Sequence, residues 1–98
     1  MPLTTTAHTK VKNNFKNMVK EGRYIIGGVT KNINIFKILQ EGDQITFYLY
    51  LDDSISGNIT AFQLIDVDGD LFDDQPDSVT KKDINGVLVA FRYTVKKL

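Results

Sequence analysis

The spacing of apolar residues along this chain changes near Gly22, from a helical period to a strand period. Before that point, four apolar residues at i, i+4, i+7 and i+8 predict one stripe of an amphipathic helix. They are Val11, Phe15, Met18 and Val19. We expect this helix to begin near Lys10 and to end at Gly22, because glycine is favoured just after a helix C-terminus. Residues 1–9 are rich in threonine and lack such spacing, so we expect a flexible tail there.

After Gly22, short runs of alternating apolar and polar residues, bounded by turn residues, predict β-strands. The runs are RYIIGGV (23–29), NINIFKIL (32–39), ITFYLYL (45–51), NITAFQLI (58–65), SVTKKDI (78–84) and VLVAFRYTV (87–95). We expect a turn at EGD (41–43) and a hairpin turn at Asn85-Gly86, a pair typical of two-residue β-turns. The pattern predicts a mainly β fold, bordering on α+β. We expect an antiparallel sandwich or barrel of about six strands with one N-terminal amphipathic helix, in which residues 10–98 form a single domain.

Two of these strands have clearly different faces. Residues 45–51 place four apolar side chains on one face, and residues 87–95 place five there; these nine are Ile45, Phe47, Leu49, Leu51, Val87, Val89, Phe91, Tyr93 and Val95. The second faces carry Tyr48, Tyr50 and Arg92. An exposed aromatic pair beside a basic group is a candidate binding site, for a protein surface or for bases and sugars. The alternative is that both faces are covered, as between layers or under the helix.

Composition narrows the possible chemistry. The chain has no cysteine, which excludes disulfides, thiolate zinc sites and a thiol nucleophile. Its single histidine, His8, lies in the predicted tail, and no serine stands in a nucleophile motif, so we do not expect an enzyme. We expect no secretory signal, because the first residues lack a basic and then an apolar segment. No apolar run approaches the roughly 20 residues that span a bilayer, so we expect no membrane partner.

The net charge of zero hides a segregation of charge. Residues 1–40 contain seven Lys or Arg and one acid, whereas residues 41–83 contain eleven acids and two Lys. A basic face formed by the lysines of residues 10–37 would suit a nucleic acid, which makes a small nucleic-acid-binding protein one alternative function. With two arginines and no excess charge, we consider nucleic acid an unlikely partner. The opposing hypothesis is that the two charged segments are neighbours in the fold and cancel.

The most acidic segment, LIDVDGDLFDDQPD (64–77), allows three interpretations. Its IDVDGDLFD run resembles the first motif of haloacid-dehalogenase-like phosphatases, which would make Asp66 the nucleophile and Asp68 an acid/base. The chain ends 30 residues after Asp68, too soon for the rest of such a domain, so we reject phosphatase chemistry.

The second interpretation is a calcium loop, because five carboxylates stand at positions 1, 3, 5, 9 and 12. They are Asp66, Asp68, Asp70, Asp74 and Asp77. An EF-hand loop needs Gly at position 6, where Leu71 stands, and Glu at position 12. An irregular calcium loop between strands, and hence a calcium-binding β-domain, stays open. The third interpretation is a solvated acidic loop that begins at about Asp66 and requires no cation.

Residues 41–95 contain EGDQITFYLYLDD, GNITAFQLIDVDGDLFDD and INGVLVAFRYTV. This succession resembles the N-terminal immunoglobulin-like domains of phage baseplate and tail-fibre proteins. The resemblance implies an assembly module that contacts other copies or subunits, without catalysis. We therefore predict a non-catalytic binding or structural module of phage or surface origin, cytoplasmic or virion-associated. It would act through protein–protein contacts, with a protein partner or as a homo-oligomer, using a sheet edge or the Tyr48/Tyr50 face.

Overall fold

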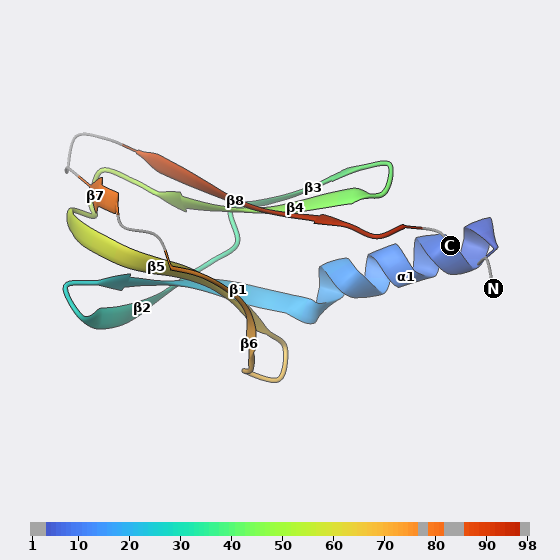
Figure 1. Cartoon of the computed structure of the whole chain (residues 1–98), viewed down its shortest axis with the longest axis horizontal. Helices are drawn as coiled ribbons and strands as arrows, with labels where there is room; N and C mark the ends of the chain where they lie inside the picture. Colours follow the sequence, from blue (N-terminus) through green and yellow to red (C-terminus); the bar gives the residue numbers. More distant parts are fainter. Residues whose placement is uncertain (1–3, 77–78, 82–85, 97–98) are drawn as a thin grey trace.

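The computed structural model describes residues 4–76, 79–81 and 86–96. In this part of the chain, one N-terminal helix, α1 (Thr5–Met18), accompanies two antiparallel sheets that stack as a sandwich. Figure 1 shows the two sheets as separate layers, with α1 at one end of them. The predicted mainly β fold is confirmed, and of its two forms the sandwich is found, because the sheets do not close into a barrel.

The larger sheet has the strand order β2-β1-β5-β6, and β7 also pairs with β5. Its strands are β1 (Val19–Ile26), β2 (Val29–Ile33), β5 (Gly57–Asp66), β6 (Leu71–Gln75) and β7 (Val79–Lys81). Ile59 of β5 lies between Ile26 of β1 and Val79 of β7, so β7 occupies the same edge of β5 as β6. The smaller sheet has the order β3-β4-β8. Its strands are β3 (Lys37–Glu41), β4 (Gln44–Leu51) and β8 (Val87–Thr94).

The run 23–29 is not one strand, as predicted, but contains a hairpin turn. Gly27 and Gly28 have φ values of 56° and 78° and join β1 to β2. A two-residue turn with positive φ at both positions matches the twist of the strands that it joins, and glycine adopts it without steric cost. The predicted EGD turn at 41–43 is confirmed, between β3 and β4.

The run 32–39 was also predicted as one strand, and the structure divides it between the two sheets. β2 ends at Ile33 and β3 begins at Lys37, so residues 34–36 cross from the larger sheet to the smaller one. Ile33 and Ile35 both pack against the core during the crossing, so the alternation of apolar residues continues although the partner strand changes. The Phe36 amide then donates a hydrogen bond to the Tyr48 carbonyl (2.8 Å) and starts the pairing with β4.

The hairpin predicted at Asn85-Gly86 is wrong. β7 pairs with β5 in the larger sheet, whereas β8 pairs with β4 in the smaller sheet, so the flanking strands lie in different layers. Asn85 itself lies outside the described residues. Gly86 has a different steric role, since a methyl group in its place would overlap the ring of Tyr50.

The core lies between the sheets and contains the predicted inward faces. Ile45, Phe47, Leu49, Leu51 and Phe91 of the smaller sheet are fully buried, as expected from the alternation. The larger sheet contributes the apolar side chains of Val19, Tyr24, Ile59, Phe62 and Leu64. Gly22, predicted to end the helix, instead lies buried within β1, where any side chain would overlap Leu49. Gly22 is therefore required for close approach of the two sheets, and not for a helix end.

The helix begins earlier than predicted. The Thr4 side chain accepts a hydrogen bond from the Ala7 amide (3.0 Å) and caps the helix, so residues 5–9 belong to α1 and do not form the expected tail. α1 ends at Met18 and continues directly into β1. Of the predicted stripe, Phe15 and Val19 pack on the core, whereas Val11 and Met18 are exposed.

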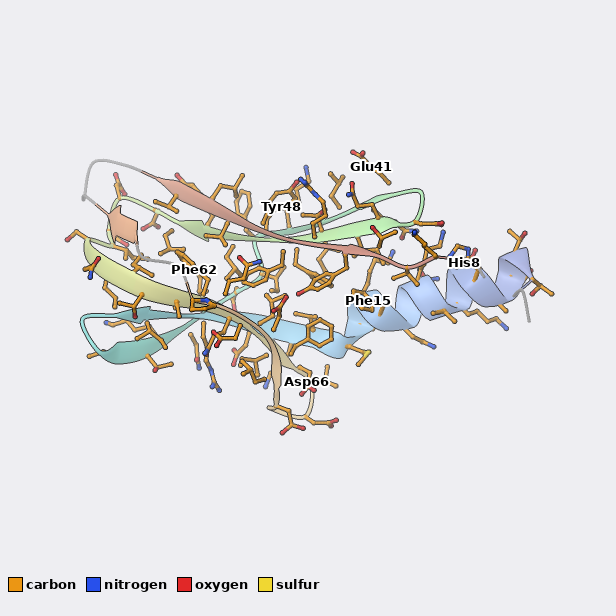
Figure 2. The ribbon with its side chains drawn as sticks, viewed as in Figure 1. His8, Phe15, Glu41, Tyr48, Phe62 and Asp66 are labelled. Carbon is orange, nitrogen blue, oxygen red and sulfur yellow. The ribbon has the colours of Figure 1, made fainter. Side chains whose placement is uncertain are left out.

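Phe15 closes the end of the sandwich. Its ring lies 6.1 Å from Phe47 and 5.2 Å from Tyr93 of the smaller sheet, and 5.6 Å from Phe72 of the larger sheet. The contacts with Phe72 and Tyr93 are edge-to-face, a favourable geometry for aromatic rings. Figure 2 shows Phe15 between the two layers where α1 joins them.

Replacing Phe15 with Ala should lower the free energy of unfolding by about 2–4 kcal/mol, because it leaves a cavity where α1, β4, β6 and β8 meet. The measurement is urea denaturation followed by circular dichroism. Val11→Ala, on the exposed side of the same helix, is the matched control and should cost less than about 0.5 kcal/mol. Equal losses for the two variants would show that Phe15 does not close the sandwich.

Candidate binding surface

The three residues predicted as a binding site share the outer face of the smaller sheet. Tyr48 and Tyr50 alternate on β4 with the buried core residues, and Arg92 lies opposite Thr46 on β8. Tyr48 and Arg92 line one open hollow of about 90 Å³. Figure 2 shows Tyr48 and Glu41 on the side of this sheet that faces away from the other layer. Among the described residues, no element packs over this face.

An apolar group occupies one end of this face, and we call it the aromatic patch: Phe36, Tyr48, Tyr50 and Leu88. Phe36, Tyr50 and Leu88 are 61%, 41% and 57% exposed. The rings of Phe36 and Tyr50 lie 5.3 Å apart, and Leu88 is directly opposite Tyr50 across the strands. Tyr50 also lies against Gly86, which leaves room for its ring. Contacts on two sides hold this exposed aromatic ring in place.

Two members of the aromatic patch, Phe36 and Leu88, are not among the binding residues that the sequence predicts. Leu88 stands on the same face of its strand as Arg92, and that alternation was visible in the sequence. Phe36 could not be placed, because its position depends on where the chain crosses between sheets.

The charged end of the same face carries both signs. Glu41 lines the hollow together with Arg92 and Tyr48, and Lys37 lies opposite Tyr48 on β3. A carboxylate beside the arginine opposes the binding of a phosphate backbone, because polyanion sites depend on uncompensated positive charge. This end therefore resembles the polar rim of a protein interface more than a nucleic-acid groove.

The outer face of the larger sheet has a different character. Arg23 donates to the side chain of Asn32 (3.2 Å), and Gln63 donates to Asp74 (3.2 Å). In the strand register Arg23 also lies opposite Gln63, so these four polar residues form a row across β2, β1, β5 and β6. This row makes the centre of that outer face polar, whereas the exposed apolar side chains of the larger sheet, Val29, Val67 and Leu71, lie outside the row.

The acidic loop predicted to begin at about Asp66 does begin there, but it is a short hairpin turn, and residues 71–75 form a strand. β5 runs to Asp66, a short turn follows, and β6 begins at Leu71. The Asp66 carboxylate accepts hydrogen bonds from the amides of Asp68 and Asp70, both at 2.9 Å. Asp66 therefore organises the turn through its own side chain, as aspartate does in many turns.

The predicted calcium ligands do not converge where the structure describes them. Among the described residues, no group of three acidic or histidine side chains could hold a metal ion. Of the predicted set, Asp66 bonds to the turn amides and Asp74 to Gln63, whereas Asp68 and Asp70 are exposed. Asp77 lies outside the described residues.

His8 is buried and fixes the helix, although the sequence placed it in a tail. Its Nε2 donates to the Val95 carbonyl (2.7 Å) and lies 3.4 Å from an Asp43 carboxylate oxygen. Lys12, one turn later, lies 3.5 Å from the same oxygen and donates to the Gly42 carbonyl (3.2 Å). These contacts attach α1 to the β3–β4 turn and to the end of β8. No sequence motif marks them, because the partners are brought together only by the fold.

Tyr93 and Asp73 form a hydrogen bond between the two sheets. The Tyr93 hydroxyl donates to the Asp73 carboxylate beside the Phe15 ring. Burial, together with the hydrogen bond and the negative charge of Asp73, raises the pKa of Tyr93 well above its ordinary value. The charged form of Tyr93 is therefore disfavoured in the folded protein.

Comparisons with protein-family models, with curated proteins and with solved structures find no match to this chain. Within the described residues, no helix combines the length and apolar character needed to cross a membrane.

The raised pKa of Tyr93 predicts a loss of stability at alkaline pH. An unfolded tyrosine ionises near pH 10. Because the folded pKa is higher, the stabilisation is complete below about pH 10 and decreases as the pH rises towards the folded pKa. Tyr93→Phe should cost about 1–2 kcal/mol at pH 7, through the lost hydrogen bond to a charged acceptor.

The measurement is urea denaturation between pH 8 and about 11.5. The difference in unfolding free energy between wild type and Tyr93→Phe should shrink above pH 10. Tyr48→Phe, on the outer face, is the control and should follow the wild type. A constant difference over the whole range would contradict the assignment.

Proposed function

We propose that this chain is a non-catalytic assembly module that binds a protein partner through the outer face of its smaller sheet. The observation that carries the proposal is the aromatic patch, where Phe36, Tyr50 and Leu88 are exposed side by side. Large apolar side chains that are exposed together on a small protein usually mark a surface that another molecule covers.

The composition of the face supports a protein as the partner. Apolar and aromatic side chains at the centre of a contact, with polar and charged groups around them, are typical of protein interfaces. The aromatic patch supplies the apolar centre, and the charged groups around it are Lys37, Glu41 and Arg92. Tyrosine is a frequent anchor in such contacts, because it buries a large area and loses little rotamer freedom. Tyr50 is partly restrained already, by Phe36 and Gly86.

The use of the titratable groups supports a function without catalysis. His8 is occupied in attaching α1, Asp66 in organising a turn and Asp73 in bonding Tyr93. Each of these contacts stabilises the fold, and none leaves a nucleophile beside a base. The resemblance of residues 41–95 to phage baseplate and tail-fibre domains fits the same proposal, since such a module would contact neighbouring subunits of a particle or surface structure.

Site-specific photo-cross-linking tests the proposal. Tyr50 is replaced with p-benzoyl-phenylalanine, and the protein is irradiated in an extract of the cells or particles in which it occurs. We expect a discrete cross-linked protein from this position, because the aromatic patch is covered by the partner. The same photoreactive residue at Gln63, on the polar outer face of the larger sheet, is the control and should give no such product.

Adding Phe36→Ser and Leu88→Ser should remove the Tyr50 product, because both flank the ring in the aromatic patch. The proposal fails if Tyr50 gives no product, or if Tyr50 and Gln63 give the same products.

A further inference from the structure

β3 is an open edge strand of the smaller sheet. The strand order β3-β4-β8 leaves one side of β3 without a neighbouring strand among the described residues. Four of its five residues are exposed, and Leu39 is half-buried. β3 pairs with β4 without a register shift and contains no proline. It thus lacks the bulges and prolines that often protect sheet edges from pairing with another chain.

The main chain of β3 offers hydrogen-bonding groups to a further strand. The two-residue turn at Gly42-Asp43 places Glu41 opposite Gln44. In an antiparallel pair closed by such a turn, bonding to the neighbouring strand alternates, beginning with the pair next to the turn. Glu41, Leu39 and Lys37 therefore bond to β4. The amide and carbonyl groups of Ile38 and Gln40 point towards the open edge.

We propose that two copies of this chain pair antiparallel through β3, about a two-fold axis at Leu39. In this register Lys37 of each copy lies opposite Glu41 of the other, so symmetry creates two pairs of opposite charge. Ile38 lies opposite Gln40, and the main-chain groups that point outwards on each copy meet. Opposite charges directly across two strands favour pairing and specify its register.

Both charged residues are available for this contact. Lys37 and Glu41 are exposed. The ion pairs among the described residues involve Asp43 with His8 and Lys12, and neither Lys37 nor Glu41 takes part in one. Pairing through β3 would therefore gain two ion pairs without breaking one that the described part of the monomer contains.

The other edge strands lack this self-complementarity. β2 has Lys31 as its one charged residue, and β8 has Arg92. β6 carries Asp73 and Asp74, and β7 carries Lys81. Among the edge strands of the described residues, β3 alone contains both signs of charge, at positions that exchange under a two-fold axis. The second copy is thus selected by the sequence of β3 and not only by an open edge.

This pairing shares Lys37 and Glu41 with the charged surroundings of the proposed binding face, but it does not use the aromatic patch that carries the proposed function. It joins two three-stranded sheets into one, with both aromatic patches on the same outer surface. The variants that test the two proposals lie on different residues, so either proposal can fail alone.

Exchange of the two charges tests the pairing by sedimentation velocity over a range of concentrations. Wild type should form a dimer. Lys37→Glu places like charges opposite each other twice, and so does Glu41→Lys. Each variant should therefore raise the dimer dissociation constant about tenfold or more. The double variant Lys37→Glu/Glu41→Lys restores opposite charges and should dimerise like wild type.

A mixture of the two single variants gives a further, specific result. Lys37→Glu has two acids in β3, and Glu41→Lys has two lysines there. When mixed, the two variants should form a heterodimer at concentrations where each variant alone is monomeric. Tyr50→Ser, in the aromatic patch, should leave dimerisation unchanged. A strictly monomeric wild type at about 1 mM would overturn the proposal. It would also be overturned by a dimer that is insensitive to the charge exchange, since this would place the contact elsewhere.

A cysteine at Leu39 tests the register directly, in a chain that has no cysteine of its own. The two-fold axis places Leu39 opposite itself at a Cα separation of about 4.5–5.5 Å, which a disulfide can span. Leu39→Cys should therefore oxidise rapidly to a covalent dimer, visible on a non-reducing gel. Thr30→Cys on β2 should not do so at the same concentration. Equal cross-linking of the two variants would reject the Leu39 axis.

Discussion

The contact of Phe15 with both sheets is the constraint on which the rest of the structure depends. The sandwich is open at the end where β4 begins and β8 finishes, and the Phe15 ring fills this end between Phe47, Phe72 and Tyr93. Because α1 continues directly into β1, it cannot move to another face without breaking this cluster. His8 and Lys12 then attach the exposed length of the helix to Asp43 and Val95. With the helix held there, the outer face of the smaller sheet stays open, and so does the edge of β3.

The sequence predicted those strands whose alternation of apolar and polar residues does not depend on which strand they pair with. The alternation in residues 45–51 and 87–95 identified the inward and outward faces of β4 and β8, because one buried face dictates a period of two. The alternation did not predict where the chain passes from one sheet to the other. Residues 32–39 alternate throughout although they serve two sheets, and Asn85-Gly86 has hairpin chemistry between strands that pair elsewhere. Gly22 shows the same difficulty. A glycine is required at position 22 because any side chain there would overlap Leu49 of the opposite sheet, and the local sequence does not reveal this contact.

The candidate surface was predicted in part for the same reason. Tyr48, Tyr50 and Arg92 share a face because they follow the strand period, and the structure places Tyr48 beside Arg92 in one hollow and Tyr50 opposite Leu88, further along the same face. Phe36 joins them through the crossover, which no periodicity indicates. In the acidic segment, regular spacing did not indicate how the carboxylates would be arranged. Its carboxylates are regularly spaced in sequence, yet Asp66 turns inward to bond the turn amides, and Asp73 and Asp74 point to opposite sides of a strand. Regular spacing in the sequence does not by itself bring carboxylates together. The path of the backbone between them decides whether they converge on one cation.

Residue-resolved hydrogen exchange at two protein concentrations tests most directly whether β3 is the assembling edge. The amides of Ile38 and Gln40 face the open side of the strand, whereas those of Lys37, Leu39 and Glu41 bond to β4. If two copies pair through β3, the Ile38 and Gln40 amides exchange slowly in concentrated solution and rapidly after dilution, and the amides of β4 change little. Rapid exchange of Ile38 and Gln40 at every concentration would contradict the pairing.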